Sequence, residues 1–240
     1  MEYAIEIDNF SKSFGIVKSV KNLTLSVKYG EIYGFLGPNG AGKSTTIKTL
    51  VGIYNKDQGI IKIDGKDISD LSYKKYIGYI PDEPYIYEGL TPKQLLSFFA
   101  ELYSIPKKEI EEKVNKALKY FYIDEDLNLQ VQDFSRGSKQ KLVISAAFMH
   151  NPKVLIIDEP MVGLDPISSI KFIKYIKDFA KSGGAVFVST HDLDIASKLC
   201  DRVGIINKGK LIIEGSIKEI EKLTNKSNLD EVFFSVINEE

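Results

Sequence analysis

One segment limits the fold of this 240-residue chain more than any other feature. Residues 37–44 read Gly-Pro-Asn-Gly-Ala-Gly-Lys-Ser and fit the pattern G-x-x-x-x-G-K-[ST] in full. The apolar run Ile32–Leu36 before it predicts a buried strand, and the spacing of apolar residues in Ser44–Val51 predicts a helix. A glycine-rich turn in this context binds phosphate, because its backbone N–H groups and the helix N-terminus point at the phosphate oxygens. The context argues against an ordinary glycine turn, which is the other explanation of the segment.

The end of this turn predicts contacts with a nucleotide and a metal ion. In loops of this pattern the lysine, here Lys43, reaches the β- and γ-phosphates, and the hydroxyl of Ser44 is placed to bind Mg²⁺. The loop alone leaves the reaction open, since kinases, GTPases, helicases and transporters share it. The residues expected to bind the nucleotide are Gly37, Pro38, Asn39, Gly40, Ala41, Gly42, Lys43, Ser44 and Thr45.

A second apolar run, Val154–Ile157, ends in the adjacent acids Asp158 and Glu159. Neighbouring side chains after a strand point in different directions, so the two acids can hold different roles. We expect Asp158 to hold Mg²⁺, directly or through water, and Glu159 to act as general base for an attacking water. Capping of the next turn is the alternative. It is less favoured because Lys43 and Asp158 both follow strands, at the edge where open α/β sheets bind ligands.

The pattern of apolar residues predicts a layered sheet. In the first thirty residues apolar and polar side chains alternate, as in Ala4–Ile7 and Val20–Val27, which predicts half-buried antiparallel strands. The runs Val154–Ile157 and Ala185–Ser189 are each followed by a helical pattern. Strands that alternate with helices form parallel sheets. We therefore expect an α/β fold with a mainly parallel sheet and an antiparallel β subdomain at the N-terminus.

Helical signals gather in the middle of the chain. Thr91, Pro92 and Gln94 have the spacing of an N-cap, a proline in the first turn and a capping-box glutamine. Helical spacing continues in Leu95–Tyr103 and Lys108–Phe121. We expect a single domain over residues 1–240, with an α/β core at about 1–83 and 151–215, an inserted helical subdomain at about 84–150, and a C-terminal tail at about 216–240.

Composition excludes several other classes of protein. The chain has 32 basic and 33 acidic side chains and a formal charge of −1, which argues against a general nucleic-acid-binding protein. The longest apolar stretch, Leu142–Met149, is far shorter than the roughly 20 residues that span a bilayer. The N-terminus lacks the apolar run of a secretory signal, and the single cysteine, Cys200, cannot form an intrachain disulfide. These observations favour a cytosolic location.

Further motifs resemble those of the ABC ATPase family and follow in the family's order. Phe134–Lys141 (FSRGSKQK) resembles the signature motif, usually written LSGGQ. Met161–Pro166 resembles the D-loop, and Phe187–Asp192 resembles the strand that carries the switch histidine. The resemblance covers nearly all of the chain. It implies a P-loop NTPase core with ATP and Mg²⁺ as cofactors.

The resemblance also assigns residues to a site shared between two copies. In the family two ATPase domains close head-to-tail, which implies that Ser135 and Gly137 contact the γ-phosphate of ATP bound by the partner. His191 is expected to hydrogen-bond the γ-phosphate or the attacking water. Asp165 would belong to the D-loop. Its position before Pro166 also has the form of a helix N-cap, and the two roles are compatible.

Four other residues leave alternatives open. Phe14 matches the family's adenine-stacking aromatic residue, and core packing is its alternative. Asp82 stands where the family usually has glutamine, in a loop that abuts the membrane partner; it could ligate Mg²⁺, or repel the γ-phosphate and slow turnover. Arg136 would add charge to the interface or face solvent. His150 is expected at the surface or at a helix cap.

The resemblance implies an ATP-hydrolysing subunit that pairs with a second copy and drives a separate transmembrane permease from the cytoplasmic face of the membrane. No contact with nucleic acid is expected. The tail Asn228–Phe234 resembles the C-terminal end of drug-, sodium- and lipid-exporter ATPases, which favours export. One alternative is a soluble ABC ATPase of the iron–sulfur-assembly type. Another is a binding-only module with a dead site, which the intact Lys43, Asp158, Glu159 and His191 argue against.

Overall fold

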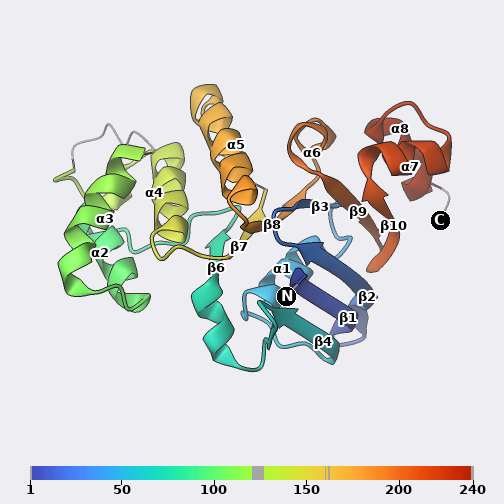
Figure 1. The fold of residues 1–240 in the computed structure, drawn as a ribbon, viewed down its shortest axis with the longest axis horizontal. Coiled ribbons are helices and arrows are strands. Elements are labelled where there is room, and N and C mark those ends of the chain that lie inside the picture. The colour runs from blue at the N-terminus through green and yellow to red at the C-terminus, as the bar shows by residue number, and fades with distance from the viewer. Residues whose placement is uncertain (1, 121–126, 160, 162, 239–240) are drawn as a thin grey trace.

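The computed structural model describes residues 2–120, 127–159, 161 and 163–238, and Figure 1 shows their arrangement. The elements in chain order are β1 (Tyr3–Phe14), β2 (Val17–Lys28), β3 (Ile32–Leu36), α1 (Lys43–Leu50), β4 (Gln58–Ile63), β5 (Lys66–Asp67), the 3₁₀ helix η1 (Leu71–Tyr76), β6 (Ile77–Ile80), α2 (Pro92–Leu102), α3 (Lys107–Tyr120), the 3₁₀ helix η2 (Val131–Asp133), α4 (Arg136–Phe148), β7 (Val154–Asp158), α5 (Pro166–Lys181), β8 (Ala185–Thr190), α6 (Leu193–Leu199), β9 (Arg202–Asn207), β10 (Lys210–Ser216), α7 (Ile217–Thr224) and α8 (Leu229–Asn238).

The N-terminal strands form an antiparallel sheet of their own. Its order is β2-β1-β4-β5, and Ile5 pairs with Val27 while Ile7 pairs with Leu25. These four side chains are buried. The alternation seen in the sequence therefore becomes one buried and one more exposed face, because successive side chains of a strand point to opposite sides. The expected antiparallel β subdomain is confirmed.

The second sheet has the order β10-β9-β3-β8-β7-β6. All pairs from β9 to β6 are parallel, and β10 pairs antiparallel with β9. Every residue of β3, β7 and β8 is buried, as in strands covered on both faces. The carboxyl ends of these three neighbouring strands meet at one edge of the sheet. The predicted α/β fold with a mainly parallel sheet is confirmed.

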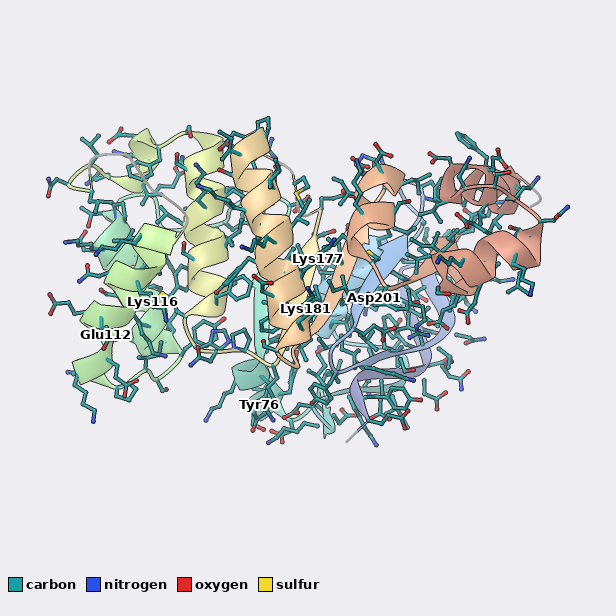
Figure 2. The ribbon with its side chains drawn as sticks, turned by 45° about the horizontal axis from the view of Figure 1, so that its top comes forward. Tyr76, Glu112, Lys116, Lys177, Lys181 and Asp201 are labelled. Carbon is teal, nitrogen blue, oxygen red and sulfur yellow. The ribbon has the colours of Figure 1, made fainter. Side chains whose placement is uncertain are left out.

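Helices cover both faces of this sheet. On one face α1 lies against the N-terminal sheet as well, and Ile47 and Leu50 of α1 join a core formed by both sheets. On the other face Phe172 and Ile176 of α5 pack on β7 and β8. Charged side chains such as Lys181 cover the outer surface of α5 (Figure 2). The helix α1, which follows the glycine-rich turn, is thus held between the N-terminal sheet and the central sheet.

The helices α2, α3 and α4 stand beside the central sheet, and in sequence they lie between β6 and β7 (Figure 1). The capping box at the start of α2 has formed between Thr91 and Gln94, as predicted. Leu95, Val114 and Leu142 belong to the core that the three helices share. The second predicted helix extended to Phe121, which lies outside the described residues.

His150 ties this helical insertion to the central sheet. Its ring stacks on Tyr103, with ring centroids 3.7 Å apart and planes at 1°, and its Nε2–H donates to the carbonyl oxygen of Ile77 at 2.9 Å. Burial lowers the pKa of His150 to about 4. The expected surface or capping position is therefore wrong, because the partners of the ring come from two distant segments of the chain.

The C-terminal residues form a helical hairpin, α7–α8, at the β9–β10 side of the central sheet (Figure 1). Leu229 and Val232 of α8 are buried and belong to one core cluster with Ile220, Leu36 and Val203. The apolar tail thus packs on the sheet. Within the described part of the chain, no helix is both long enough and apolar enough to cross a membrane.

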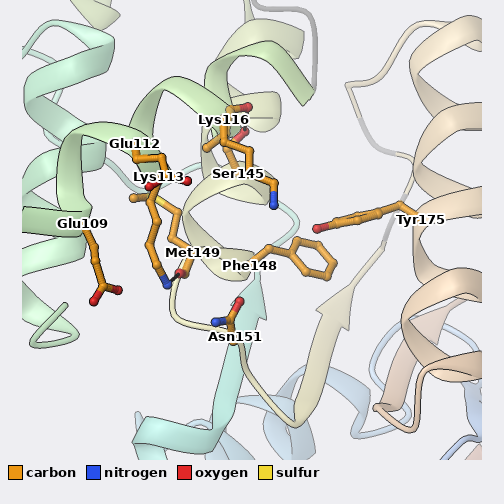
Figure 3. Close-up of a pocket in the computed structure, with 10 residues that line it drawn as sticks. Glu109, Glu112, Lys113, Lys116, Ser145, Phe148, Met149, Asn151 and Tyr175 are labelled. Atoms are coloured by element: carbon orange, nitrogen blue, oxygen red, sulfur yellow. Dashed lines mark hydrogen bonds between the residues drawn. The ribbon is translucent and has the colours of Figure 1, made fainter. Parts of the chain in front are cut away.

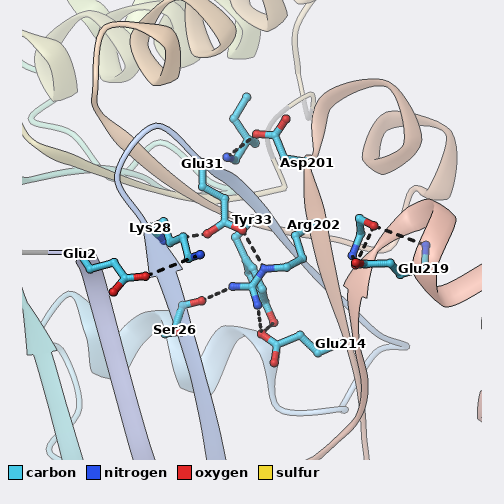
Figure 4. A network of polar contacts seen from close by, with 11 residues as sticks. Glu2, Ser26, Lys28, Glu31, Tyr33, Asp201, Arg202, Glu214 and Glu219 are labelled. Atoms are coloured by element: carbon cyan, nitrogen blue, oxygen red, sulfur yellow. Dashed lines mark hydrogen bonds and ion pairs between the residues drawn. The ribbon is translucent and has the colours of Figure 1, made fainter.

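Arg202 joins the two sheets through a network of polar contacts (Figure 4). Its guanidinium group donates to Glu31 at 2.7 Å, to Glu214 at 3.1 Å and to the carbonyl oxygen of Ser26. It also lies 5.0 Å from the ring centroid of Tyr33. Ser26 belongs to β2 and the other partners to the central sheet or the turn before it, so one side chain connects the two layers.

Candidate active site

The turn between β3 and α1 needs glycine for steric reasons. A Cβ at Gly37 would lie 2.4 Å from the carbonyl oxygen of Ile206, and one at Gly42 would lie 2.7 Å from the carbonyl oxygen of Ser19. Gly42 also has a φ of 112°, which residues with side chains rarely adopt. The turn is therefore packed tightly against β9 and β2, which fixes its backbone at the N-terminus of α1.

Lys43 is buried inside this turn. Its Nζ donates to the carbonyl oxygens of Gly37 at 2.6 Å and Pro38 at 3.2 Å. Burial lowers the pKa of Lys43, and the negative charges of Glu159 and Asp158 oppose this effect. The ammonium group is thus held close to two carboxylates, in a turn whose backbone is shaped to receive phosphate.

Asp158 is the last residue of β7 and is buried. It accepts a hydrogen bond from the hydroxyl of Ser189 on the neighbouring strand β8. Burial raises the pKa of Asp158, the Ser189 bond lowers it, and the carboxylates of Asp82 and Glu159 raise it further. A nearby cation would stabilise a carboxylate crowded in this way, so Asp158 fits a divalent metal ion.

Glu159 follows in a backbone conformation that glutamate seldom adopts, with a φ of 51°. Its N–H donates to the carbonyl oxygen of Ser189 at 3.0 Å. Its carboxylate accepts from the hydroxyl of Thr190 at 3.1 Å and lies 2.8 Å from Nδ1 of His191. Residues in a strained backbone conformation that is held by their neighbours cluster at functional sites, so the strain at Glu159 supports a functional role for its carboxylate.

These side chains line one cleft of about 340 Å³ at the carboxyl edge of the central sheet. The loop after β6 brings Asp82 into the same cleft. Gly37 and Ala41, which were also expected to bind the nucleotide, belong to the same turn. The residues that line the cleft are Ser19, Pro38, Asn39, Gly40, Gly42, Lys43, Ser44, Thr45, Asp82, Asp158, Glu159 and His191.

Ser19 is a lining residue that the sequence analysis missed. It comes from β2, and its hydroxyl lies 2.8 Å from the hydroxyl of Thr45. No local pattern marks Ser19, because only the packing of β2 against α1 brings it to the cleft.

Phe14 is not among the residues that line the cleft. It ends β1 with 45% of its surface exposed, and its ring meets Tyr54 edge-on with centroids 5.1 Å apart. Lys12 Nζ lies 5.4 Å from the ring centroid of Phe14. Its exposure argues against the core-packing alternative, and adenine stacking by Phe14 stays a prediction.

The signature residues lie outside the cleft of their own chain. Ser135 is the N-cap of α4 and accepts from the N–H of Ser138 at 3.1 Å. Gly137 lies against the D-loop, where a Cβ would come within 2.6 Å of the carbonyl oxygen of Gly163. The aliphatic part of the exposed Arg136 flanks Gly163 as well. The N-terminus of α4 therefore presents Ser135 and Gly137 at a place other than the chain's own Lys43.

Asp165 has the predicted N-cap role at the start of α5. Its carboxylate accepts from the N–H of Ser168 at 2.9 Å and pairs with Lys141 of α4 at 3.3 Å. The hydroxyl of Ser168 and, to a smaller extent, its backbone N–H donate to the carboxylate and hold the pKa of Asp165 below its usual range. Pro160 and Val162, which belong to the expected motifs, lie outside the described residues.

A larger groove of about 520 Å³ lies between the helical subdomain and α5 (Figure 3). The rings of Phe148 and Tyr175 meet in it with centroids 4.2 Å apart. Its lining contains none of the residues expected to bind the nucleotide, so the two hollows are separate. The residues that line it are Glu109, Glu112, Lys113, Lys116, Ala117, Ser145, Phe148, Met149, Asn151 and Tyr175.

Fold and cleft together define a class of protein. A phosphate-binding turn after one parallel strand and two acids after a neighbouring strand open into the same cleft, at the sheet edge where such folds bind ligands. This combination is that of a P-loop nucleotide hydrolase.

Comparison with known proteins supplies the family. A family model described as "ABC transporter" matches residues 20–162. The "SkfA peptide export ATP-binding protein SkfE" of Bacillus subtilis is 38% identical over 218 residues, which cover 91% of each chain. The "Linearmycin resistance ATP-binding protein LnrL" of Bacillus subtilis is 34% identical over 98% of this chain and 76% of its own. A solved "Structure of ATP binding subunit of ABC transporter" is 31% identical, with a TM-score of 0.91, and covers 97% of this chain and 99% of its own.

The chain belongs to the ABC transporter family, in which it is an ATP-binding and ATP-hydrolysing subunit. The resemblance drawn from the motifs is thereby confirmed. A soluble ATPase of the iron–sulfur-assembly type is not favoured.

Proposed function

We propose that this subunit hydrolyses Mg²⁺-ATP in the cleft beside Lys43 and drives export through a separate permease, from the cytoplasmic face of the membrane. The observation that carries the proposal is the meeting of Lys43, Asp158, Glu159 and His191 in one cleft. The four residues lie at or beyond the carboxyl ends of three neighbouring strands, β3, β7 and β8, so the core of the sheet fixes their relative positions.

The cleft suits an in-line attack by water on the γ-phosphate. Lys43 and the N–H groups of the turn bind the β- and γ-phosphates. Ser44 and Asp158 would hold Mg²⁺, which supplies positive charge against the phosphate oxygens. The two carboxylates that raise the pKa of Asp158 agree with a cation at this position.

Glu159 acts as the general base in this proposal. The contact with His191 requires the proton on Nδ1, because a carboxylate only accepts, and it holds the Glu159 carboxylate in place. Neutral His191 then has Nε2 left as an acceptor for the attacking water. Glu159 accepts the proton of that water as its oxygen approaches phosphorus.

Replacement of Glu159 by glutamine tests the assignment. Glu159→Gln keeps the size of the side chain but removes the base, so turnover should fall by about 10²–10⁴-fold while ATP still binds. Phosphate release and binding of a fluorescent ATP analogue measure the two properties. Glu111→Gln, an exposed change on α3, is the matched control. Normal turnover of the Glu159 variant would remove this residue as the base.

A second copy of the chain completes each site in this proposal. Ser135 and Gly137 lie at the N-terminus of α4, where N–H groups and the helix dipole attract negative charge. Neither residue is among those that line the chain's own cleft. Both observations support a contact of Ser135 and Gly137 with the γ-phosphate of ATP bound by the partner.

Export rests on the relatives rather than on the cleft. Two of them are named for peptide export and for linearmycin resistance, which supports outward transport of a peptide or an antibiotic. Affinity purification of the tagged chain from detergent-solubilised membranes tests for the permease. A co-purifying polytopic protein is the expected result, and recovery of soluble partners alone would contradict transport.

We also propose that Asp82 keeps hydrolysis slow until the permease docks. Its carboxylate lines the cleft beside Asp158, where it repels the γ-phosphate. Its loop follows the edge strand β6 and leads into the helical subdomain.

A further inference from the structure

A buried hydrogen bond links the signature helix to the loop that carries Asp82. Gln140 of α4 is 1% exposed, and its Nε2 donates to the carbonyl oxygen of Pro81 at 3.1 Å. Pro81 is itself buried and directly precedes Asp82. The helix whose N-cap is Ser135 is thus joined to the backbone next to the ATP cleft.

The other end of the Gln140 amide has no partner. Its Oε1 is buried and makes no hydrogen bond to the described part of the chain. The orientation of the amide is fixed, because the carbonyl oxygen of Pro81 only accepts hydrogen bonds. A buried acceptor without a partner costs free energy, and an apolar side chain of similar size would move that cost from Oε1 to the carbonyl oxygen of Pro81. The side chain of Gln140 therefore adds little net stability at this position.

Ser145, a buried neighbour on the same helix, provides a contrast. Its hydroxyl donates to the carbonyl oxygen of Lys141 at 2.8 Å, so its main bond stays within α4. The bond of Gln140 instead crosses 59 positions of sequence, to Pro81 directly after β6.

We infer that Gln140 is a positioning residue that fixes the Asp82 carboxylate in the cleft, so that the placement of α4 sets the rate of hydrolysis in the same chain. The inference rests on the proposed role of Asp82. The bond ends on the residue directly before Asp82, so the side chain of Gln140 passes a displacement of α4 to the backbone next to Asp82. In the proposed dimer, α4 also faces the nucleotide of the partner. Gln140 then connects the state of one ATP site to the chemistry of the other.

Gln140→Met tests the inference in the full chain without permease. The variant removes the bond at nearly constant size, so Asp82 is released and basal kcat should rise about threefold, with KM for ATP nearly unchanged. The midpoint of thermal unfolding should shift little. The variant removes the unpartnered Oε1 of Gln140 but leaves the carbonyl oxygen of Pro81 without its donor, so the number of unpartnered acceptors stays the same. Ser145→Ala is the matched control and should leave kcat unchanged.

Two further variants separate positioning from a merely structural role. In the background of Asp82→Asn, adding Gln140→Met should change kcat no further, because both substitutions act through one carboxylate. The carboxyl group that Gln140→Glu introduces can donate to Pro81 only when it is protonated. Relative to the wild type, Gln140→Glu should therefore behave normally at acidic pH and like Gln140→Met at alkaline pH.

The outcomes are distinguishable. If Asp82→Asn changes the basal rate and Gln140→Met does not, the role of Gln140 is wrong and that of Asp82 stands. If Asp82→Asn has no effect, the role of Asp82 falls and the inference falls with it. Additive effects in the double variant, or a large loss of thermal stability at unchanged kcat, would also overturn the inference.

Discussion

Asp82 adds a third carboxylate to a cleft that already holds Asp158 and Glu159. Asp82→Asn removes this charge at constant size, and we expect the basal ATPase rate to rise about three- to tenfold because repulsion of the γ-phosphate is relieved. Phosphate release from the purified chain measures the rate. Glu83→Gln, a change at the exposed neighbour outside the cleft, should have no effect. Equal rates for Asp82→Asn and the wild type would show that the charge does not limit hydrolysis.

Asp158 gives a second prediction at this scale. Its pKa is raised in the folded state, chiefly by burial, so the folded chain favours the protonated form. The stability that this shift contributes is present at low pH and is lost as pH rises through the folded pKa. At neutral pH and without metal, Asp158→Asn should therefore raise the unfolding midpoint, by about 2–4 °C.

Thermal unfolding with and without Mg²⁺-ATP measures this effect. Mg²⁺-ATP should stabilise the wild type much more than Asp158→Asn, because Mg²⁺ offsets the charge that the variant lacks. Asp133→Asn serves as control, because Asp133 is exposed and is not among the residues that line the cleft. A lower midpoint for metal-free Asp158→Asn would contradict the prediction.

Local motifs explain which site residues were predictable. Lys43 ends the glycine-rich turn after β3, and Asp158 and Glu159 lie at the end of β7, so a one-dimensional pattern places all three at the sheet edge. Ser19 and Gln140 carry no such mark. Both reach the site through packing between segments that are distant in sequence, which no local pattern records.

At the scale of elements, the contact between the end of α4 and β6 contains a titratable group, His150, which makes stability depend on pH. The pKa of His150 falls from 6.5 to about 4, mainly because the ring is buried. Between these values the unfolded chain binds more protons than the folded one, so stability is lost as pH falls through this window. His150→Phe keeps the ring stack on Tyr103 but cannot titrate.

Urea unfolding at several pH values tests this prediction. From about pH 7 to pH 4.5 the wild type should lose on the order of 1–3 kcal/mol more than His150→Phe. The variant also loses the bond to Ile77, so its absolute stability at pH 7 should be lower. Parallel pH profiles for the two proteins would exclude His150 as the titrating group.

The helix α8 offers a prediction with a matched control. Leu229 is 1% exposed in the core between α8 and the sheet, whereas Leu223 on α7 is 74% exposed. Leu229→Ala should lower the free energy of unfolding by about 2–4 kcal/mol, because it leaves a cavity. Leu223→Ala should change it by less than about 0.5 kcal/mol. Equal effects in urea unfolding would mean that α8 is not anchored through Leu229.

Elements were predictable where their signals are local. The capping box of α2 and the apolar run of β3 need only neighbouring residues, so both appear in the sequence pattern. The order of strands in the sheet and the stack of His150 on Tyr103 depend on contacts between distant segments. Periodicity holds no information about such contacts.

On the scale of the whole molecule, the separation of the cleft from Ser135 can be tested by mixing two inactive variants. Lys43→Ala should be unable to hydrolyse ATP in its own cleft, and Ser135→Arg should be unable to complete the cleft of a partner. A mixed head-to-tail dimer still contains one intact site. Equal mixing should then restore about a quarter of wild-type activity, since half of the dimers are mixed and half of their sites are intact.

Phosphate release from the separate and mixed proteins measures this complementation. A mixture of Lys43→Ala with Glu159→Gln serves as control. It should stay inactive, because neither chain then supplies both a working turn and a working base. Absence of recovery in the main mixture would contradict a shared site.

The network around Arg202 also bears on how this sequence can change over evolutionary time. All but two of the 32 basic residues are lysine, so arginine is rare in this chain. Lysine is a compact point charge and cannot replace a planar fork that reaches Glu31, Glu214 and the Ser26 carbonyl together. Arg202→Lys would therefore leave at least one of these three acceptors without its donor. A homologue that carries lysine here should show compensating replacements at both glutamates.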